Sequence, residues 1–333
     1  MKNISKRYIF LIIVLVCAYI LMPVFVSAEN ISDPLPSWND LSARQRIISF
    51  VNSVNNSSNK QYVPVKKRIA VFDLDGTIFC EKPLYLQVQI AAEKLYDIAK
   101  ENKDLRKIEP YKSAWLRDEN YISDSKNFLD MNLKAFAGDS VEEYKEYTMN
   151  FLTERENPDY KVPYIELFYT PMLELLEYLR ANDFQVYIVS GSPQEFIRSF
   201  SEKELETPIE KVIGDTFTIN FSVRDNKALF IRGNTVVLPE VLREGKAENI
   251  RMRTGTVPIL AFGNSNDDIA MLELAAASGL PNLSLTLHHD DAKREYSYDK
   301  GADKVLKTAK ERGWVIVSMK NDFKKIFNLK GDK

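Results

Sequence analysis

Two carboxylates stand one residue apart at the end of a short apolar segment. Residues 68–72 (Arg-Ile-Ala-Val-Phe) form a β-branched and aromatic run that is typical of a buried parallel strand. Residues 73–77 (Asp-Leu-Asp-Gly-Thr) follow at once, and Gly76 allows a sharp turn. Acidic side chains at the end of a buried strand repel each other unless a cation compensates their charge. The segment therefore predicts a divalent cation beside Asp73 and Asp75.

Two further apolar segments also end in polar clusters. Residues 185–189 run into Ser-Gly-Ser, and residues 258–262 run into Gly-Asn-Ser-Asn-Asp-Asp. A hydroxyl such as that of Ser190 beside a helix N-terminus suits an anion, and Lys246 supplies a positive charge. Oxygen donors without Cys or His favour magnesium over zinc. Because the carboxyl ends of parallel strands meet at one edge, these groups predict a phosphate site beside a cation and a carboxylate nucleophile.

Each of these pieces also has an ordinary interpretation. Asp-x-Asp-Gly is usually a turn or a calcium loop, and Ser-Gly-Ser is usually a loop. A single Lys among 45 basic residues is usually solvated, and the pair Asp267 and Asp268 could simply cap a helix. The combination favours a site, because all the pieces occur in order and most of them stand at the end of a strand.

Alternating strand and helix patterns predict the architecture that positions these groups. Strand-like segments occur at residues 68–72, 185–189, 258–262, 283–287 and 314–318. Helical patterns occur between them at residues 171–181, 193–204 and 267–277. This alternation predicts an α/β fold, a parallel sheet with helices on both faces. Between residues 85 and 164 only helix-period segments occur, such as 86–100 and 141–155, which predicts a helical insertion.

The motifs at residues 71–77, 188–192, 246 and 263–268 resemble those of the haloacid dehalogenase (HAD)-like hydrolase superfamily, nearest its phosphoserine-phosphatase-like branch. The resemblance covers roughly residues 67–333 and implies a three-layer core with a Rossmann-like parallel sheet. Residues 67–84 and 165–333 would form this catalytic core, with residues 85–164 as an inserted helical cap. Residues 38–40 (Trp-Asn-Asp) and 79–83 (Phe-Cys-Glu-Lys-Pro) also look similar to exported phosphatases of this superfamily.

The resemblance implies a magnesium-dependent phosphomonoester hydrolase that acts on a small phosphorylated metabolite. Asp73 would attack phosphorus to form an aspartyl-phosphate, and Asp75 would act as acid and then as base. The remaining roles would be phosphate binding by Ser190, Gly191 and Lys246, and Mg²⁺ binding by Asp73, the Asp75 carbonyl, and Asn264 or Asp268. Glu81 lies near the place where phosphoserine phosphatases carry a substrate-facing carboxylate.

One position departs from the family pattern, and several functions remain open. The superfamily usually has Asp where this chain has Asn264, whose amide oxygen can bind magnesium without adding charge. Asp75 argues against dehalogenation, because the family's dehalogenases lack this second Asp. The alternatives are a phosphotransferase acting through the same intermediate and a non-catalytic exported binding protein of this fold.

The N-terminal segment predicts export. Residues 1–28 combine a basic start, an apolar run at residues 8–25 and a Val-Ser-Ala ending, which is the pattern of a secretory signal cleaved after Ala28. The alternative is an uncleaved membrane anchor at residues 8–25. If the signal is cleaved, the protein would be periplasmic or extracellular and would retain Cys80 as its single cysteine. A formal net charge of -2 gives no reason to expect nucleic-acid binding.

Residues 29–66 predict an N-terminal helical arm. Within it, Ser37 would cap a helix that runs from about Trp38 to Val54.

Overall fold

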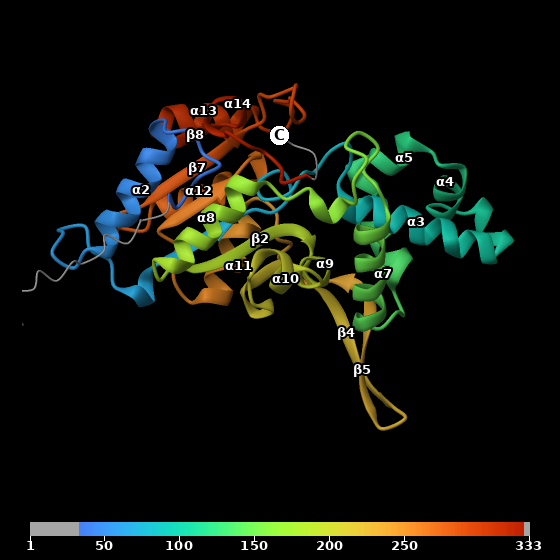
Figure 1. Cartoon of the computed structure of the whole chain (residues 1–333). Helices are drawn as coiled ribbons and strands as arrows, with labels where there is room; N and C mark the ends of the chain where they lie inside the picture. The colour runs from blue at the N-terminus through green and yellow to red at the C-terminus, as the bar shows by residue number, and fades with distance from the viewer. Residues whose placement is uncertain (1–32, 330–333) are drawn as a thin grey trace, which may run out of the picture. The chain divides into compact units, whose positions relative to one another are not determined.

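Six parallel strands form one sheet in the order β3-β2-β1-β6-β7-β8 (Figure 1). The computed structural model describes residues 33–329, so the predicted signal at residues 1–28 lies outside the described part. The strand bounds are β1 Ile69–Phe72, β2 Gln185–Pro193, β3 Val212–Asp215, β6 Leu260–Gly263, β7 Leu283–His288 and β8 Val315–Ser318. The predicted parallel sheet is confirmed, and β1 lies between β2 and β6.

Alternate residues of β1 face opposite sides of the sheet, and each side is covered by helices. Ala70 and Phe72 belong to a core shared with α2 (Ser42–Asn55) and α8 (Thr170–Ala181). Ile69 and Val71 belong to a second core, shared with helices that come later in the chain. These helices are α11 (Glu244–Thr254), α12 (Ile269–Ala276) and α13 (Asp303–Arg312). The result is the predicted three-layer α/β fold.

A group of helices is inserted between β1 and β2. It comprises α3 (Leu86–Glu101), α4 (Tyr111–Leu116), α5 (Glu119–Ser123), α6 (Phe128–Phe136) and α7 (Val141–Glu154). Helix α3 packs against both α4 and α6. At the start of α7, the Ser140 hydroxyl accepts from the Glu143 amide while the Glu143 carboxylate accepts from the Ser140 amide. The two helices predicted at residues 86–100 and 141–155 are confirmed.

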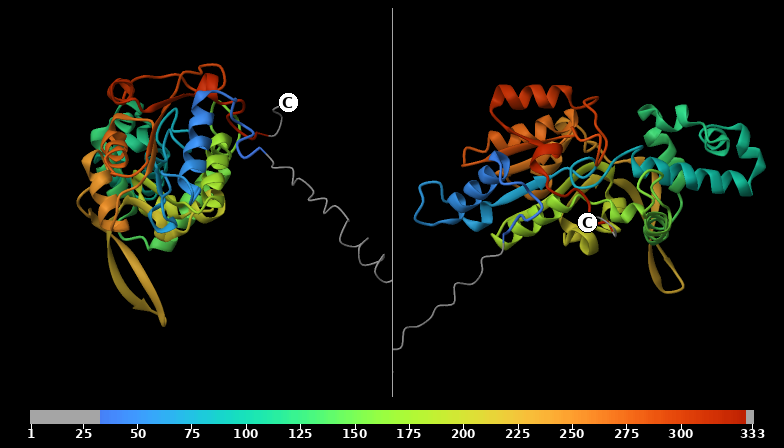
Figure 2. Two further views of the ribbon diagram at one scale, coloured as in Figure 1. Left: turned by 90° about the vertical axis from the view of Figure 1, so that its left-hand side faces the viewer. Right: turned by 45° about the horizontal axis from the view of Figure 1, so that its top comes forward.

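An antiparallel hairpin separates the strands β3 and β6. Its strands are β4 (Phe217–Arg224) and β5 (Lys227–Val236). In both views of Figure 2 the hairpin projects away from the helices and strands of the core. This hairpin and β3 were not predicted. The sequence does carry a signal for the hairpin, because apolar and polar residues alternate along β4 and the turn residues Asp225 and Asn226 follow. Both turn residues have positive φ in the structure.

Two helix predictions are wrong in detail. Helix α2 begins at Ser42 rather than Trp38, because the Trp38 indole is buried and donates to the Pro171 carbonyl at 2.8 Å. The helix predicted at residues 193–204 is two short helices, α9 (Gln194–Arg198) and α10 (Ser201–Leu205). Among residues 33–329, every helix is too short or too polar to cross a membrane.

Candidate active site

Strand register brings the predicted site residues to one edge of the sheet. Phe72 of β1 pairs with Ile188 of β2 on one side and with Phe262 of β6 on the other. The segments that begin at Asp73, Ser190 and Gly263 therefore emerge side by side at the carboxyl ends of the three strands. Helix α11 adds Lys246 from its first turn.

Lys246 joins two carboxylates in the interior of the site. Its Nζ donates to Asp73 Oδ1 at 2.6 Å and to Asp268 Oδ1 at 2.5 Å. All three side chains are buried. Burial and the nearby Asp268 raise the pKa of Asp73, and Lys246 opposes this shift. Burial disfavours the Lys246 ammonium, but Asp268 and Asp73 outweigh it and raise the pKa of Lys246.

The second carboxyl group, Asp75, is held by two hydroxyls. Ser192 Oγ donates to Asp75 Oδ2 at 2.6 Å, and Ser190 Oγ donates to the same oxygen at 3.1 Å. Asp75 Oδ1 is buried and has no partner among the described residues. Burial raises the pKa of Asp75 to about 6, although the Ser192 hydrogen bond opposes the shift. Ser192 was not among the predicted site residues, and Ser190 was predicted to bind the phosphate rather than Asp75.

Oxygen atoms converge where Asn264 meets the loop after β1. The amide atom of Asn264 that faces this loop lies 3.1 Å from both Asp73 Oδ2 and the Asp75 carbonyl oxygen. When this atom is Oδ1, Thr77 donates to it at 3.1 Å and three oxygens face one another. Adjacent ligands of an octahedral Mg²⁺ at 2.0–2.1 Å lie about 2.9 Å apart, so this arrangement fits the ion. When it is Nδ2, the amide donates to both oxygens instead.

The predicted ligand Asp268 already has partners at both carboxylate oxygens. Its Oδ1 accepts from Lys246, and its Oδ2 accepts from the backbone N–H groups of Asn264 and Ser265 at 3.0 and 2.8 Å. Within residues 33–329, no three side chains of His, Cys, Asp or Glu are grouped as metal ligands. This is expected for a site in which a backbone carbonyl and the Asn264 amide supply two of the oxygens.

Gly76 is required by the close approach of the site loops. Its φ of +73° lies in the left-handed region, and a Cβ at this position would lie 2.1 Å from Asn264 Nδ2. Its carbonyl accepts from His289 Nε2 at 2.7 Å, and His289 Nδ1 lies 3.1 Å from Glu295 Oε2. His289 was not among the predicted site residues, and it is buried directly against the loop that follows β1.

A cavity of about 290 Å³ opens in front of these groups. Asp73, Asp75 and Lys246 line it from the core, and the inserted helices α3 and α6 contribute residues such as Asn132. Asp215 and Glu240 also line it, although neither was among the predicted site residues.

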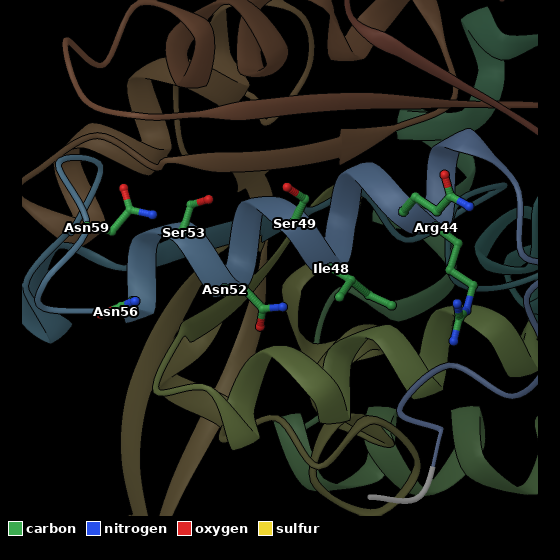
Figure 3. Close-up of a pocket in the computed structure, with 8 residues that line it drawn as sticks. Arg44, Ile48, Ser49, Asn52, Ser53, Asn56 and Asn59 are labelled. Carbon is green, nitrogen blue, oxygen red and sulfur yellow. The ribbon is translucent and has the colours of Figure 1, made fainter.

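A separate hollow of about 520 Å³ lies along α2. Figure 3 shows its lining side chains fanning out from α2 and the loop after it rather than converging on a point. It has no lining residue in common with the cavity described above.

Comparisons with known proteins give a matching family and solved structures of similar fold. The family described as haloacid dehalogenase-like hydrolase matches residues 70–273. A conserved protein of unknown function from Anaerococcus prevotii is 17% identical, with 83% of this chain and 91% of that chain covered at a TM-score of 0.53. A protein of unknown function from Bordetella pertussis is 15% identical, with 75% and 98% covered at a TM-score of 0.50.

A phosphoserine phosphohydrolase-like protein from Francisella tularensis is 14% identical, with 75% of this chain and 94% of that chain covered at a TM-score of 0.42. At these identities, the likeness to the structures from Anaerococcus prevotii and Bordetella pertussis shows a shared fold. A search of curated proteins gives no match.

Proposed function

Because the chain belongs to the haloacid dehalogenase-like hydrolase family, we propose that it is a phosphatase that hydrolyses small phosphomonoesters through Asp73. The observation that carries this proposal is the pairing of two carboxyl groups in different environments. Burial raises the pKa of both groups, but only Asp73 accepts a hydrogen bond from an ammonium, that of Lys246, which opposes the shift, whereas Asp75 has only hydroxyl donors and a pKa of about 6. Two such groups at one cavity suit a nucleophile beside an acid.

The reaction proceeds in two displacements at phosphorus. In the first, an Asp73 carboxylate oxygen bonds to phosphorus, the ester P–O bond breaks, and Asp75 gives its proton to the departing alkoxide. In the second, Asp75 takes a proton from water, the water oxygen bonds to phosphorus, and the bond to Asp73 breaks to release phosphate. A carboxyl group with a pKa of about 6 serves in both directions near neutral pH.

Magnesium fits the oxygens contributed by Asp73, the Asp75 carbonyl and Asn264. When bound, the ion would neutralise charge between the Asp73 carboxylate and the phosphoryl group. The Asp268 carboxylate holds Lys246 and the amides of its own loop, which fixes the ammonium beside Asp73. Ser190 and Gly191 line the same cavity and complete the candidate phosphoryl site.

The test is turnover of a generic aryl phosphate with magnesium by an Asp73→Asn variant. We expect activity to fall below a few per cent of wild type, because an amide does not serve as the nucleophile. Asp104→Asn is the matched control, since Asp104 is exposed on the inserted helices. Retention of activity by Asp73→Asn with a normal circular dichroism spectrum would refute the mechanism.

We also propose that the protein is exported, on the basis of the signal pattern in residues 1–28. Intact mass of the native protein tests this. A protein that begins near Glu29 outside the cytoplasm supports cleavage. A mass that includes residues 1–28 in a membrane fraction supports the anchor alternative.

A further inference from the structure

One wall of the cavity carries two acidic side chains that form no ion pair within the described residues. We call Asp215 and Glu240 the acidic wall; Asp215 is buried and Glu240 is half-buried. Asp215 Oδ1 accepts from the Val241 amide at 2.6 Å. Among residues 33–329, no Lys or Arg forms an ion pair with either carboxylate. Burial raises the pKa of Asp215 to about 6; the Val241 amide opposes this shift, and the neighbouring Glu240 adds to it.

Apart from the proposed reacting groups Asp73 and Asp75, the other acidic side chains at the cavity already have a basic partner. Glu81 pairs with Lys82 at 3.2 Å, and Asp267 pairs with Arg243 at 3.1 Å. The acidic wall is therefore the part of the cavity at which a negative charge remains uncompensated away from the reacting groups.

The cavity also lacks a free cation. Lys246 is its one basic lining residue among those described, and its ammonium is shared between Asp73 and Asp268. A substrate carboxylate would therefore find no free cation and would face the acidic wall.

The inserted helices add a hydrogen-bond acceptor that has no donor. Asn132 of α6 lines the cavity and is 4% exposed. Its Nδ2 donates to the Phe128 carbonyl at 3.3 Å, which fixes the amide orientation. Its Oδ1 is buried without a hydrogen-bond partner. A buried acceptor left unpaired is unfavourable, so this oxygen indicates a ligand that donates an N–H or O–H group.

We propose that the substrates are phosphomonoesters of amino alcohols that carry an ammonium group and no carboxylate. The proposal rests on the phosphatase function proposed above. The phosphoryl group lies at Asp73, and the ammonium group is stabilised by Asp215 and Glu240 and donates to Asn132. The cavity of about 290 Å³ suits a phosphate with a short alkyl chain.

The test compares kcat/KM for three esters of similar size with magnesium present. The ester 2-aminoethyl phosphate has charge and donors, 2-hydroxyethyl phosphate has a donor alone, and propyl phosphate has neither. We expect 2-aminoethyl phosphate to exceed propyl phosphate by about ten- to hundred-fold, the range of a charge-assisted hydrogen bond, with the hydroxyl ester between them. Phosphoserine should be cleaved less efficiently than 2-aminoethyl phosphate, because its carboxylate would meet no free cation in the cavity.

Two variants assign the preference to this part of the cavity. Glu240→Gln keeps the shape of the side chain and removes its charge, and Asn132→Leu removes the acceptor. Each variant should lower the ratio of kcat/KM for 2-aminoethyl phosphate to kcat/KM for propyl phosphate by about ten-fold. The matched controls are Glu202→Gln and Asn150→Leu, at exposed positions in other helices, and they should leave the ratio unchanged.

The outcomes separate this inference from the proposed function. If an aryl phosphate is hydrolysed but the ratio is close to one, or phosphoserine is the better substrate, the phosphatase stands and the substrate class is refuted. A high ratio that neither Glu240→Gln nor Asn132→Leu changes would refute the assignment to these residues. If no phosphate ester is hydrolysed, the proposed function itself fails.

Discussion

Replacing Lys246 by Met should destabilise the protein far more than replacing its partner Asp73 by Asn. Lys246 Nζ lies 2.6 Å from Asp73 Oδ1 and 2.5 Å from Asp268 Oδ1, and its side chain is 3% exposed. Without the ammonium, two buried carboxylates would face each other with no compensating charge. Removing one partner from a buried ion pair costs about 3–5 kcal/mol, and we expect Lys246→Met to lose this much.

The contrast with Asp73→Asn comes from the three-residue arrangement. Removing the Asp73 charge leaves one ammonium facing one carboxylate, Asp268, and also removes the repulsion between the two acids. We therefore expect Asp73→Asn to stay within about 1 kcal/mol of wild type. The double variant Lys246→Met with Asp73→Asn should be more stable than Lys246→Met alone, because one buried carboxylate then remains instead of two.

Urea unfolding at pH 7 in the presence of a chelator measures these differences without bound metal. The free energy of unfolding comes from the midpoint and the m value, and an unchanged m value shows that the same surface unfolds. The reasoning would be refuted if Lys246→Met unfolded within 1 kcal/mol of wild type. It would also be refuted if the double variant were less stable than Lys246→Met.

Four further predictions test single groups of the site. Asp75→Asn should slow alkyl phosphates far more than aryl phosphates, because a basic alkoxide depends most on protonation; equal losses in kcat/KM would show that Asp75 is not the acid. The pKa of Asp215 is raised from 3.8 to about 6, so its stabilising contribution is full below pH 3.8 and is lost as pH rises through 6. Urea unfolding should show wild type losing about 2 kcal/mol relative to Asp215→Asn between pH 4 and pH 7, and parallel pH curves would contradict this. Asn264→Asp should lower and Asn264→Ala should raise the magnesium concentration for half-maximal binding and activity; calorimetric titration measures binding directly, and an unchanged Asn264→Ala would show that Asn264 is not a ligand. His289→Phe should lower kcat by about ten-fold with little change in KM, because the donor to the Gly76 carbonyl is lost, and His289→Gln should recover part of this; equal kcat in both variants would refute a positioning role.

The local pattern of the sequence was enough to place the central strands and their polar ends. Residues 68–72 are apolar and β-branched and are followed at once by two acids, so β1 and the catalytic loop could be predicted without knowing what surrounds them. The same holds for Ser190 and Asn264, which follow similar runs. Parallel strands place their carboxyl ends at one edge, so the meeting of these residues follows from the sheet topology.

The tertiary structure decided which partners each of these groups meets. Lys246 lies 173 positions from Asp73 along the chain, and only the packing of α11 against the sheet brings its Nζ within 2.6 Å. The same is true of Ser192 on Asp75 and of His289 on the Gly76 carbonyl, whose sequence neighbourhoods give no sign of these contacts.

The residues of the cavity wall show most clearly what could not be predicted from the sequence. Asp215 is the last residue of a strand that was not predicted, and Asn132 is one of several amides on helices that the sequence could only describe as an insertion. Whether a carboxylate is paired or an amide oxygen is orphaned depends on burial and on groups distant in sequence. Periodicity determines which face of an element is apolar, whereas the charge and hydrogen-bond partners of a buried polar group are determined only when the elements pack together.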